Sequence, residues 1–145
     1  MDFINRRDFV KNSALAVGAP YVLSDSKNTS NETVGVGVIG LRGRGREHLE
    51  GFQRLPGVQV KAICDIDDEI IAASLEKFSN SGWKHPAVYK DMRELLEDKN
   101  IDAVSFATPN HWHALGTVWA CQAGKHVYVE NPASHNVREG RLMVE

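Results

Sequence analysis

Cysteine is scarce in this chain of 145 residues, which contains only Cys64 and Cys121. Two cysteines so far apart exclude a zinc knuckle and a disulfide framework, and we expect both to be buried apolar residues. A basic excess is also missing, because the net charge is -2 and charges of both signs are mixed. This balance argues against a dedicated nucleic-acid-binding protein. Without internal repeats or low-complexity tracts, the chain has the composition of one ordinary globular domain.

The first 33 residues are predicted to be a targeting segment and not part of the fold. Residues 5–11, which include Arg6 and Arg7, resemble the twin-arginine export signal, and residues 13–23 add a short, mildly apolar stretch. That stretch is too short to span a membrane stably, and residues 24–33 have the polar composition of a linker. We therefore expect residues 1–33 to be a twin-arginine signal peptide and linker, and the protein to be periplasmic or otherwise exported, without membrane contact afterwards. An exposed amphipathic helix is the alternative.

From Val34 onward, short β-rich apolar runs alternate with helical stretches. This alternation is typical of a parallel sheet with crossover helices. The sequence therefore predicts an α/β fold over residues 34–145, with a Rossmann-type doubly wound parallel sheet. Its last helix meets the chain end without a cap, so we expect the domain to be incomplete at its C-terminus. Strands are expected at residues 34–39, 58–64, 87–89, 101–107 and 126–130, and helices at residues 46–55, 67–78, 91–97, 112–123 and 136–145.

A glycine-rich turn follows the first predicted strand. Glycines let the backbone turn tightly, so that amide N–H groups at the next helix N-terminus face a pyrophosphate. Asp65, at the end of the second strand, would accept hydrogen bonds from ribose hydroxyls and repel a 2′-phosphate, so NAD is the predicted cofactor and NADP is less favoured. A helix N-cap is the alternative role for Asp65. The turn residues are Gly40, Leu41, Arg42, Gly43, Arg44 and Gly45.

Four motifs make the chain resemble the N-terminal domain of the Gfo/Idh/MocA (glucose–fructose oxidoreductase, inositol dehydrogenase and MocA) family. They are the glycine turn and residues 62–65, 107–113 and 124–132, in family order and at family spacing. The resemblance implies that this domain binds NAD or NADP. It also implies that a hydride passes between the nicotinamide and a sugar or cyclitol carbon, which a second, sheet-forming domain holds.

The resemblance also implies cofactor contacts beyond the turn. Thr108, Pro109 and Asn110 would line the path from adenosine to nicotinamide, and His113 would pack beside the cofactor. A metal site at His111 and His113 is not expected, because residues two apart on a helix face different ways and no third ligand is evident.

The chain departs from the family pattern at two motifs. Arg42 stands where many relatives have a second turn glycine, and Arg42 and Arg44 either offer charge to phosphate groups or form a solvated loop pair. Asn131 stands where relatives usually carry the lysine of a Glu-Lys-Pro motif, whose proline bond is often cis. Asparagine can donate a hydrogen bond, but it has no positive charge and relays no proton near neutral pH. Glu130 is expected to contact the nicotinamide ribose, Asn131 is expected to belong to the cofactor site as well, and no residue of this chain is assigned a catalytic role.

Three functions are compatible with the sequence. The leading one is the NAD-binding domain of an exported oxidoreductase that acts on a sugar or cyclitol alcohol. The second is an NAD-dependent glycoside hydrolase, in which transient oxidation of the sugar permits elimination, and the third is a non-catalytic dinucleotide-binding module. Relatives continue with a substrate-holding sheet domain that also makes oligomer contacts. We therefore expect the chain to be a fragment that meets a sugar-like substrate, and forms homo-oligomers, only when that domain is supplied.

Overall fold

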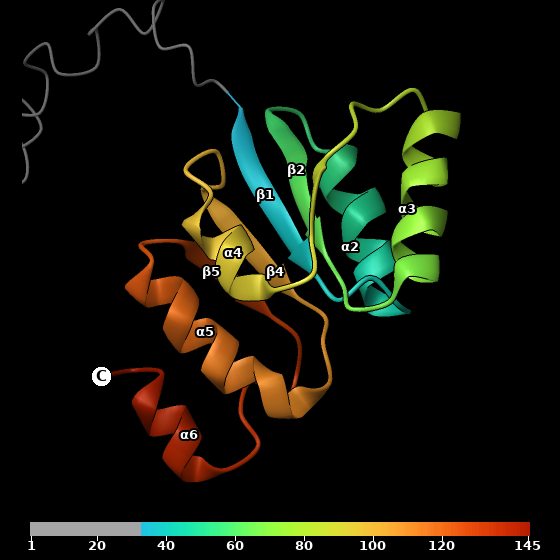
Figure 1. The fold of residues 1–145 in the computed structure, drawn as a ribbon. Helices are drawn as coiled ribbons and strands as arrows, with labels where there is room; N and C mark the ends of the chain where they lie inside the picture. Colours follow the sequence, from blue (N-terminus) through green and yellow to red (C-terminus); the bar gives the residue numbers. More distant parts are fainter. Residues whose placement is uncertain (1–32) are drawn as a thin grey trace, which may run out of the picture. The chain divides into compact units, whose positions relative to one another are not determined.

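The computed structural model describes residues 33–145, which build a sheet of five parallel strands. The spatial order is β3-β2-β1-β4-β5, and Figure 1 shows β1 in the middle of the sheet. The chain winds outward from β1 to β3, then returns to the other side of β1, so its direction reverses between β1 and β4. This is the predicted Rossmann-type doubly wound sheet. Its strands are β1 (Val34–Ile39), β2 (Val58–Cys64), β3 (Ala87–Tyr89), β4 (Ala103–Phe106) and β5 (His126–Val129).

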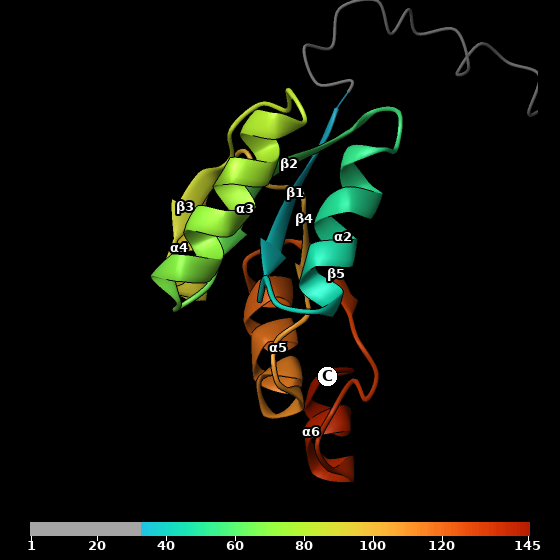
Figure 2. The ribbon, with the colours of Figure 1, turned by 90° about the vertical axis from the view of Figure 1, so that its right-hand side faces the viewer.

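Helices cover both faces of this sheet. Figures 1 and 2 show α2 and α3 on one face and α4 and α5 on the other. None of the helices within residues 33–145 is long and apolar enough to cross a bilayer. The helical elements are α2 (Arg44–Gln53), α3 (Asp68–Asn80), α4 (Met92–Glu97), the short 3₁₀ helix η2 (Asn110–Trp112), α5 (His113–Gln122) and α6 (Val137–Leu142).

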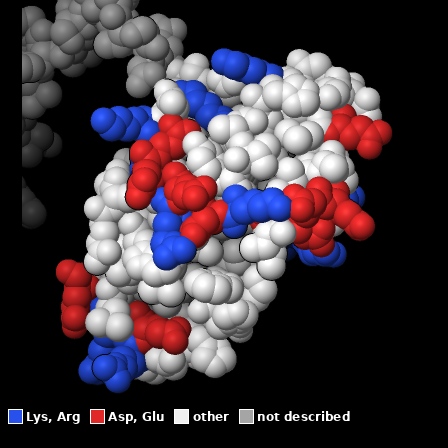
Figure 3. Space-filling view, viewed as in Figure 1, with Lys and Arg blue, Asp and Glu red and all other residues white. Residues whose placement is uncertain are grey.

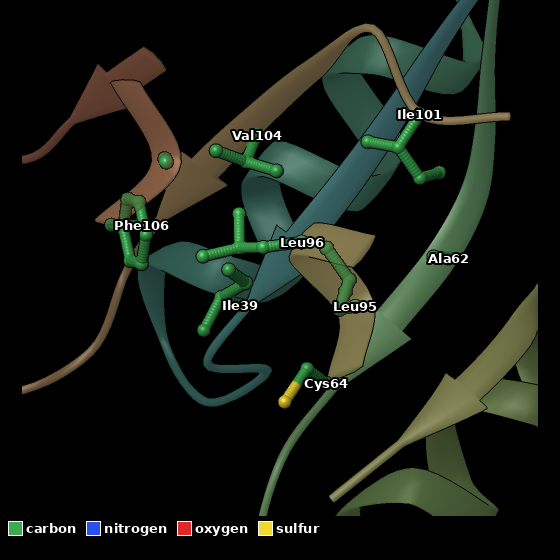
Figure 4. Packing of buried hydrophobic residues seen from close by; sticks show 9 residues of the cluster. Ile39, Ala62, Cys64, Leu95, Leu96, Ile101, Val104 and Phe106 are labelled. Atoms are coloured by element: carbon green, nitrogen blue, oxygen red, sulfur yellow. The ribbon is translucent and has the colours of Figure 1, made fainter. Parts of the chain in front are cut away.

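Each face of the sheet has its own apolar core. Val38, Leu49 and Phe78 belong to the cluster under α2 and α3, whereas Figure 4 shows the cluster that includes Leu95 and Phe106, on the side of α4 and α5. Burial on both faces explains why the central strands are almost continuously apolar. The two cores fix the strand ends from which the candidate site is built.

Two cysteine predictions have different outcomes. Cys64 is buried at the end of β2, and this burial raises the pKa of its thiol to about 12. Cys121 is exposed near the end of α5, so the prediction of a buried apolar role is wrong for this residue. The neighbouring Ala120 faces the core instead, and no signal in the sequence distinguishes the two positions.

Some element bounds differ from those predicted. Helix α2 ends at Gln53, and Leu55, which precedes Pro56, is half exposed instead of continuing the buried face. Strand β4 starts at Ala103, and the preceding residue, Asp102, is still hydrogen-bonded to Gly35 of the neighbouring strand β1. The Asp102 carboxylate accepts from the Gly35 N–H at 2.7 Å, and the Asp102 N–H donates to the Gly35 carbonyl at 2.8 Å.

The last predicted helix, residues 136–145, is shorter in the structure. Helix α6 begins after Asn136, whose side chain caps it by accepting from the Glu139 N–H at 3.0 Å, and it ends at Leu142. The predicted twin-arginine motif falls within residues 1–32, outside the described part of the chain.

Candidate functional site

The glycine turn joins β1 to α2 by a very close approach of two backbone segments. Gly40 has φ 85° and Gly43 has φ 44°, a region that side chains rarely allow. A Cβ atom at Gly45 would lie 1.8 Å from the Gly40 carbonyl oxygen. The turn therefore requires glycine at Gly45 for space and at Gly40 for both space and conformation, in agreement with the roles predicted for them.

Asp65 ties the end of β2 to this turn. Its Oδ2 accepts from the Leu41 N–H at 2.8 Å, and its Oδ1 accepts from the Asp67 N–H at 3.1 Å. Each carboxylate oxygen can accept a second hydrogen bond, so both remain able to accept from ribose hydroxyls. The N-cap of α3 is Asp67 and not Asp65, since Asp67 accepts from Glu69 and Ile70. The hydrogen bond from the Glu69 N–H is the main cause that lowers the pKa of Asp67.

Both arginines of the turn are paired with carboxylates. Arg42 donates to Asp67, whereas Arg44 donates to Glu47 and its Nη2 lies 3.4 Å from Oε1 of Glu130. Figure 3 shows acidic and basic side chains interleaved over the face it presents. Both arginine side chains are also largely exposed, so the two predicted roles, a phosphate contact or a solvated loop pair, both stay predictions.

The loop after β4 packs against the glycine turn. A Cβ atom at Gly40 would lie 2.8 Å from the Ala107 carbonyl oxygen and 2.9 Å from the Thr108 nitrogen. The hydroxyl of Thr108 is buried and has no hydrogen-bond partner among residues 33–145. Pro109 and Asn110 are exposed where η2 begins. A buried hydroxyl without a partner is uncommon, and a ligand group at this edge would satisfy it.

His113 connects this loop to the one after β5. The ring is buried, with Nε2 at 2.8 Å from the Thr108 carbonyl oxygen and Nδ1 at 2.8 Å from the Pro132 carbonyl oxygen. Both ring nitrogens thus contact backbone. His113 therefore packs the two loops together, and its position beside the cofactor stays a prediction.

Strand β5 brings the Glu130-Asn131-Pro132 motif to the same edge of the sheet. The Glu130 N–H donates to the Phe106 carbonyl at 3.2 Å, which continues the β4–β5 pairing by one residue. The Asn131–Pro132 bond is cis, as the family resemblance implied. Asn131 is exposed. The structure brings all the predicted contact residues to the carboxyl edge of the strands, and their contacts with a cofactor stay predictions.

His48 is a site residue that the sequence prediction missed. It is buried on α2, where it joins Ser105 of β4 to Glu130. The available signal was its position, since His48 shares the inward face of α2 with Gly45, Leu49 and Phe52. A polar side chain on a buried helix face usually has a specific partner.

These features together fit a dinucleotide. The turn lies where the winding direction of the sheet reverses, which is where ligands bind in open α/β sheets. The backbone approaches closely at Gly40 and Gly45, Asp65 can accept from a ribose, and the orphan hydroxyl of Thr108 lies beside them.

Comparison with known proteins agrees with this geometry. Residues 34–145 match the family described as "Oxidoreductase family, NAD-binding Rossmann fold". The chain is 41% identical over 118 residues to a glycosyl hydrolase family 109 protein of Shewanella sp. (strain MR-4), covering 79% of this chain and 26% of that protein. It is 39% identical over 112 residues to the alpha-N-acetylgalactosaminidase of Shewanella oneidensis, covering 74% of this chain and 24% of that protein. The chain thus spans about a quarter of the length of these relatives.

A solved structure shares the fold. The myo-inositol dehydrogenase of Lactobacillus casei, in complex with NAD(H) and myo-inositol, superimposes with a TM-score of 0.71 at 31% identity. The similarity covers 77% of this chain and 32% of that one.

Proposed function

We propose, from the premise that this chain belongs to the Gfo/Idh/MocA family of oxidoreductases with an NAD-binding Rossmann fold, that it forms the NAD-binding part of a protein acting on sugars. The observation that carries this proposal is the close contact of Gly45 with Gly40 beside the loop after β4. The turn would hold the pyrophosphate and Asp65 a ribose. NAD, when bound, supplies a site that takes up a hydride and can return it.

Of the three functions compatible with the sequence, we propose the NAD-dependent glycoside hydrolase. The Shewanella sp. (strain MR-4) glycosyl hydrolase family 109 protein and the Shewanella oneidensis alpha-N-acetylgalactosaminidase are 41% and 39% identical to this chain, against 31% for the inositol dehydrogenase. A hydrolase of this kind returns the hydride within each cycle and needs no external oxidant. The substrate would then be an α-N-acetylgalactosaminide or a similar glycoside, bound by a part of the protein beyond this domain.

A domain exchange tests the proposal. Residues 34–145 replace the aligned segment of the Shewanella oneidensis alpha-N-acetylgalactosaminidase, and the chimera is assayed with a nitrophenyl α-N-acetylgalactosaminide and NAD. We expect release of nitrophenol in many turnovers without accumulation of NADH, with the parent enzyme as the control. NADH that accumulates in step with sugar oxidation would instead identify a dehydrogenase domain.

A binding-only role has a distinct outcome in the same assay. The observation that favours this role is Asn131, which lacks the charge of the usual lysine. A chimera that binds NAD and does not turn over would support it. Activity restored by Asn131→Lys would then assign the defect to this position.

We also propose that the protein is exported by the twin-arginine route, on the basis of Arg6 and Arg7 in the sequence. Export in the folded state would let the domain take up NAD in the cytoplasm. Replacing both arginines with lysine should retain the protein in the cytoplasm, as measured by cell fractionation. We also propose that the complete protein binds a sugar-like ligand and forms homo-oligomers. We propose no nucleic-acid partner and no membrane partner after export.

A further inference from the structure

Three hydrogen-bonded polar side chains, Ser105, His48 and Glu130, link β4, α2 and the end of β5. His48 is only 9% exposed, with Nδ1 at 2.7 Å from the Ser105 hydroxyl and Nε2 at 2.8 Å from Oε1 of Glu130. The ring is held edge-on by Phe52 and Tyr128, at centroid distances of 6.1 and 5.3 Å. His48 therefore has a fixed position between its two polar partners.

A neutral imidazole satisfies every group in this hydrogen-bonded set. An ionised Glu130 only accepts, so Nε2–H donates to it, and Nδ1 then accepts from the Ser105 hydroxyl. Serine, histidine and glutamate in this order resemble a catalytic triad, but Ser105 is 0% exposed and out of reach of any substrate. The effect of these hydrogen bonds is therefore on Glu130, whose carboxylate is the most exposed of the three groups.

The carboxylate of Glu130 is held through one of its two oxygens. Oε1 receives His48 at 2.8 Å, and Arg44 and the Tyr128 hydroxyl lie at 3.4 Å from the same atom. The hydrogen bond from His48 is the main cause that lowers the pKa of Glu130, and the charge of Arg44 adds to it. His48 provides the shortest and most buried of these contacts.

We propose that His48 is a positioning residue, which holds Glu130 by Oε1 so that Oε2 accepts a hydrogen bond from a hydroxyl of the NAD ribose. This inference rests on the proposed function, because it requires NAD at the carboxyl edge of the sheet. It couples the helix that follows the glycine turn to the motif at the end of β5. A loss of His48 would leave Glu130 to Arg44 and Tyr128, which are exposed and more distant.

Two substitutions test the contacts of the two ring nitrogens of His48 separately. His48→Asn keeps a group that can reach Ser105 and loses the donor to Glu130, whereas His48→Gln places an amide N–H near the position of Nε2. In titration calorimetry of the full chain with NAD, we expect about tenfold weaker binding for His48→Asn and binding within about threefold of wild type for His48→Gln. His85→Asn, at an exposed histidine of the loop before β3, is the matched control.

The pH dependence distinguishes positioning from simple destabilisation. Ionised Glu130 accepts a hydrogen bond, so NAD affinity falls as the pH decreases through its pKa. Without the His48 donor that pKa is higher, and the fall in affinity should occur at higher pH in His48→Asn than in wild type. The charged and polar groups that face Glu130 are His48, Arg44 and Tyr128. A general loss of structure would weaken binding without moving the pH profile.

A double-mutant cycle completes the test. In a Glu130→Gln background, His48→Asn should cause less than a twofold further loss. Equal losses in both backgrounds, or a folded His48→Asn protein with wild-type affinity, would overturn the inference alone. If His48→Asn does not fold, Ser105→Ala takes its place, and its loss must likewise vanish with Glu130→Gln. A wild-type chain that binds no NAD would overturn the proposed function and this inference with it.

Discussion

Replacing Gly45 with alanine is expected to weaken NAD binding by about 100-fold or more. The new Cβ would lie 1.8 Å from the Gly40 carbonyl oxygen, which is backbone and cannot rotate away. Either the turn opens or α2 moves away from β1, and both changes displace the amide groups that face the pyrophosphate. Displacement of such groups by about 1 Å can cost on the order of 100-fold. Titration calorimetry with NAD measures the effect, and thermal unfolding shows how far stability also falls.

Gly51→Ala is the matched control for this substitution. Gly51 lies in the same helix, and a Cβ atom there would meet nothing within 4 Å. Alanine should stabilise the helix by up to about 1 kcal/mol and leave NAD affinity unchanged. If Gly45→Ala bound NAD as tightly as Gly51→Ala, the close-approach account of the turn would be wrong.

Asp65→Asn is expected to reduce the preference for NAD over NADP by at least tenfold. The carboxylate is predicted to accept from ribose hydroxyls and to repel a 2′-phosphate, so its removal should improve NADP binding while it weakens NAD binding. Asparagine keeps an acceptor for either the Leu41 or the Asp67 N–H. The ratio of the two dissociation constants, measured by calorimetry on wild type and variant, gives the effect.

Asp68→Asn controls for the loss of one negative charge nearby. Asp68 is exposed in the first turn of α3 and pairs with Lys90, so its removal should leave the cofactor ratio unchanged. A wild-type protein that binds NADP much more tightly than NAD would contradict the assignment of Asp65.

The parallel α/β sheet and the position of the glycine turn were predictable because both follow from local patterns. Alternating apolar runs and helical stretches imply parallel strands, and glycine at a strand end implies a tight turn. Element bounds were less predictable because tertiary hydrogen bonds set them. The Asp102 carboxylate, just before β4, accepts from the Gly35 N–H, and these two residues lie 67 positions apart in the chain. No local pattern contains that contact.

The site followed from the sequence only where a motif has a fixed geometry. The turn glycines and Asp65 were identified, but the pairing of Arg42 with Asp67 and of Arg44 with Glu130 depends on how α2 packs against the strand ends. His48 was missed for the same reason, since its partners Ser105 and Glu130 come from two other strands. A polar residue on a buried helix face signals a partner without naming it.

The hydrogen bond from the Leu41 N–H to Asp65 has a consequence for the thermodynamics of binding. It holds the glycine turn in shape before any dinucleotide arrives. The backbone entropy of ordering this turn is therefore lost during folding and not during association, which favours affinity. The heat-capacity change on association should accordingly reflect only the surface buried by the dinucleotide itself.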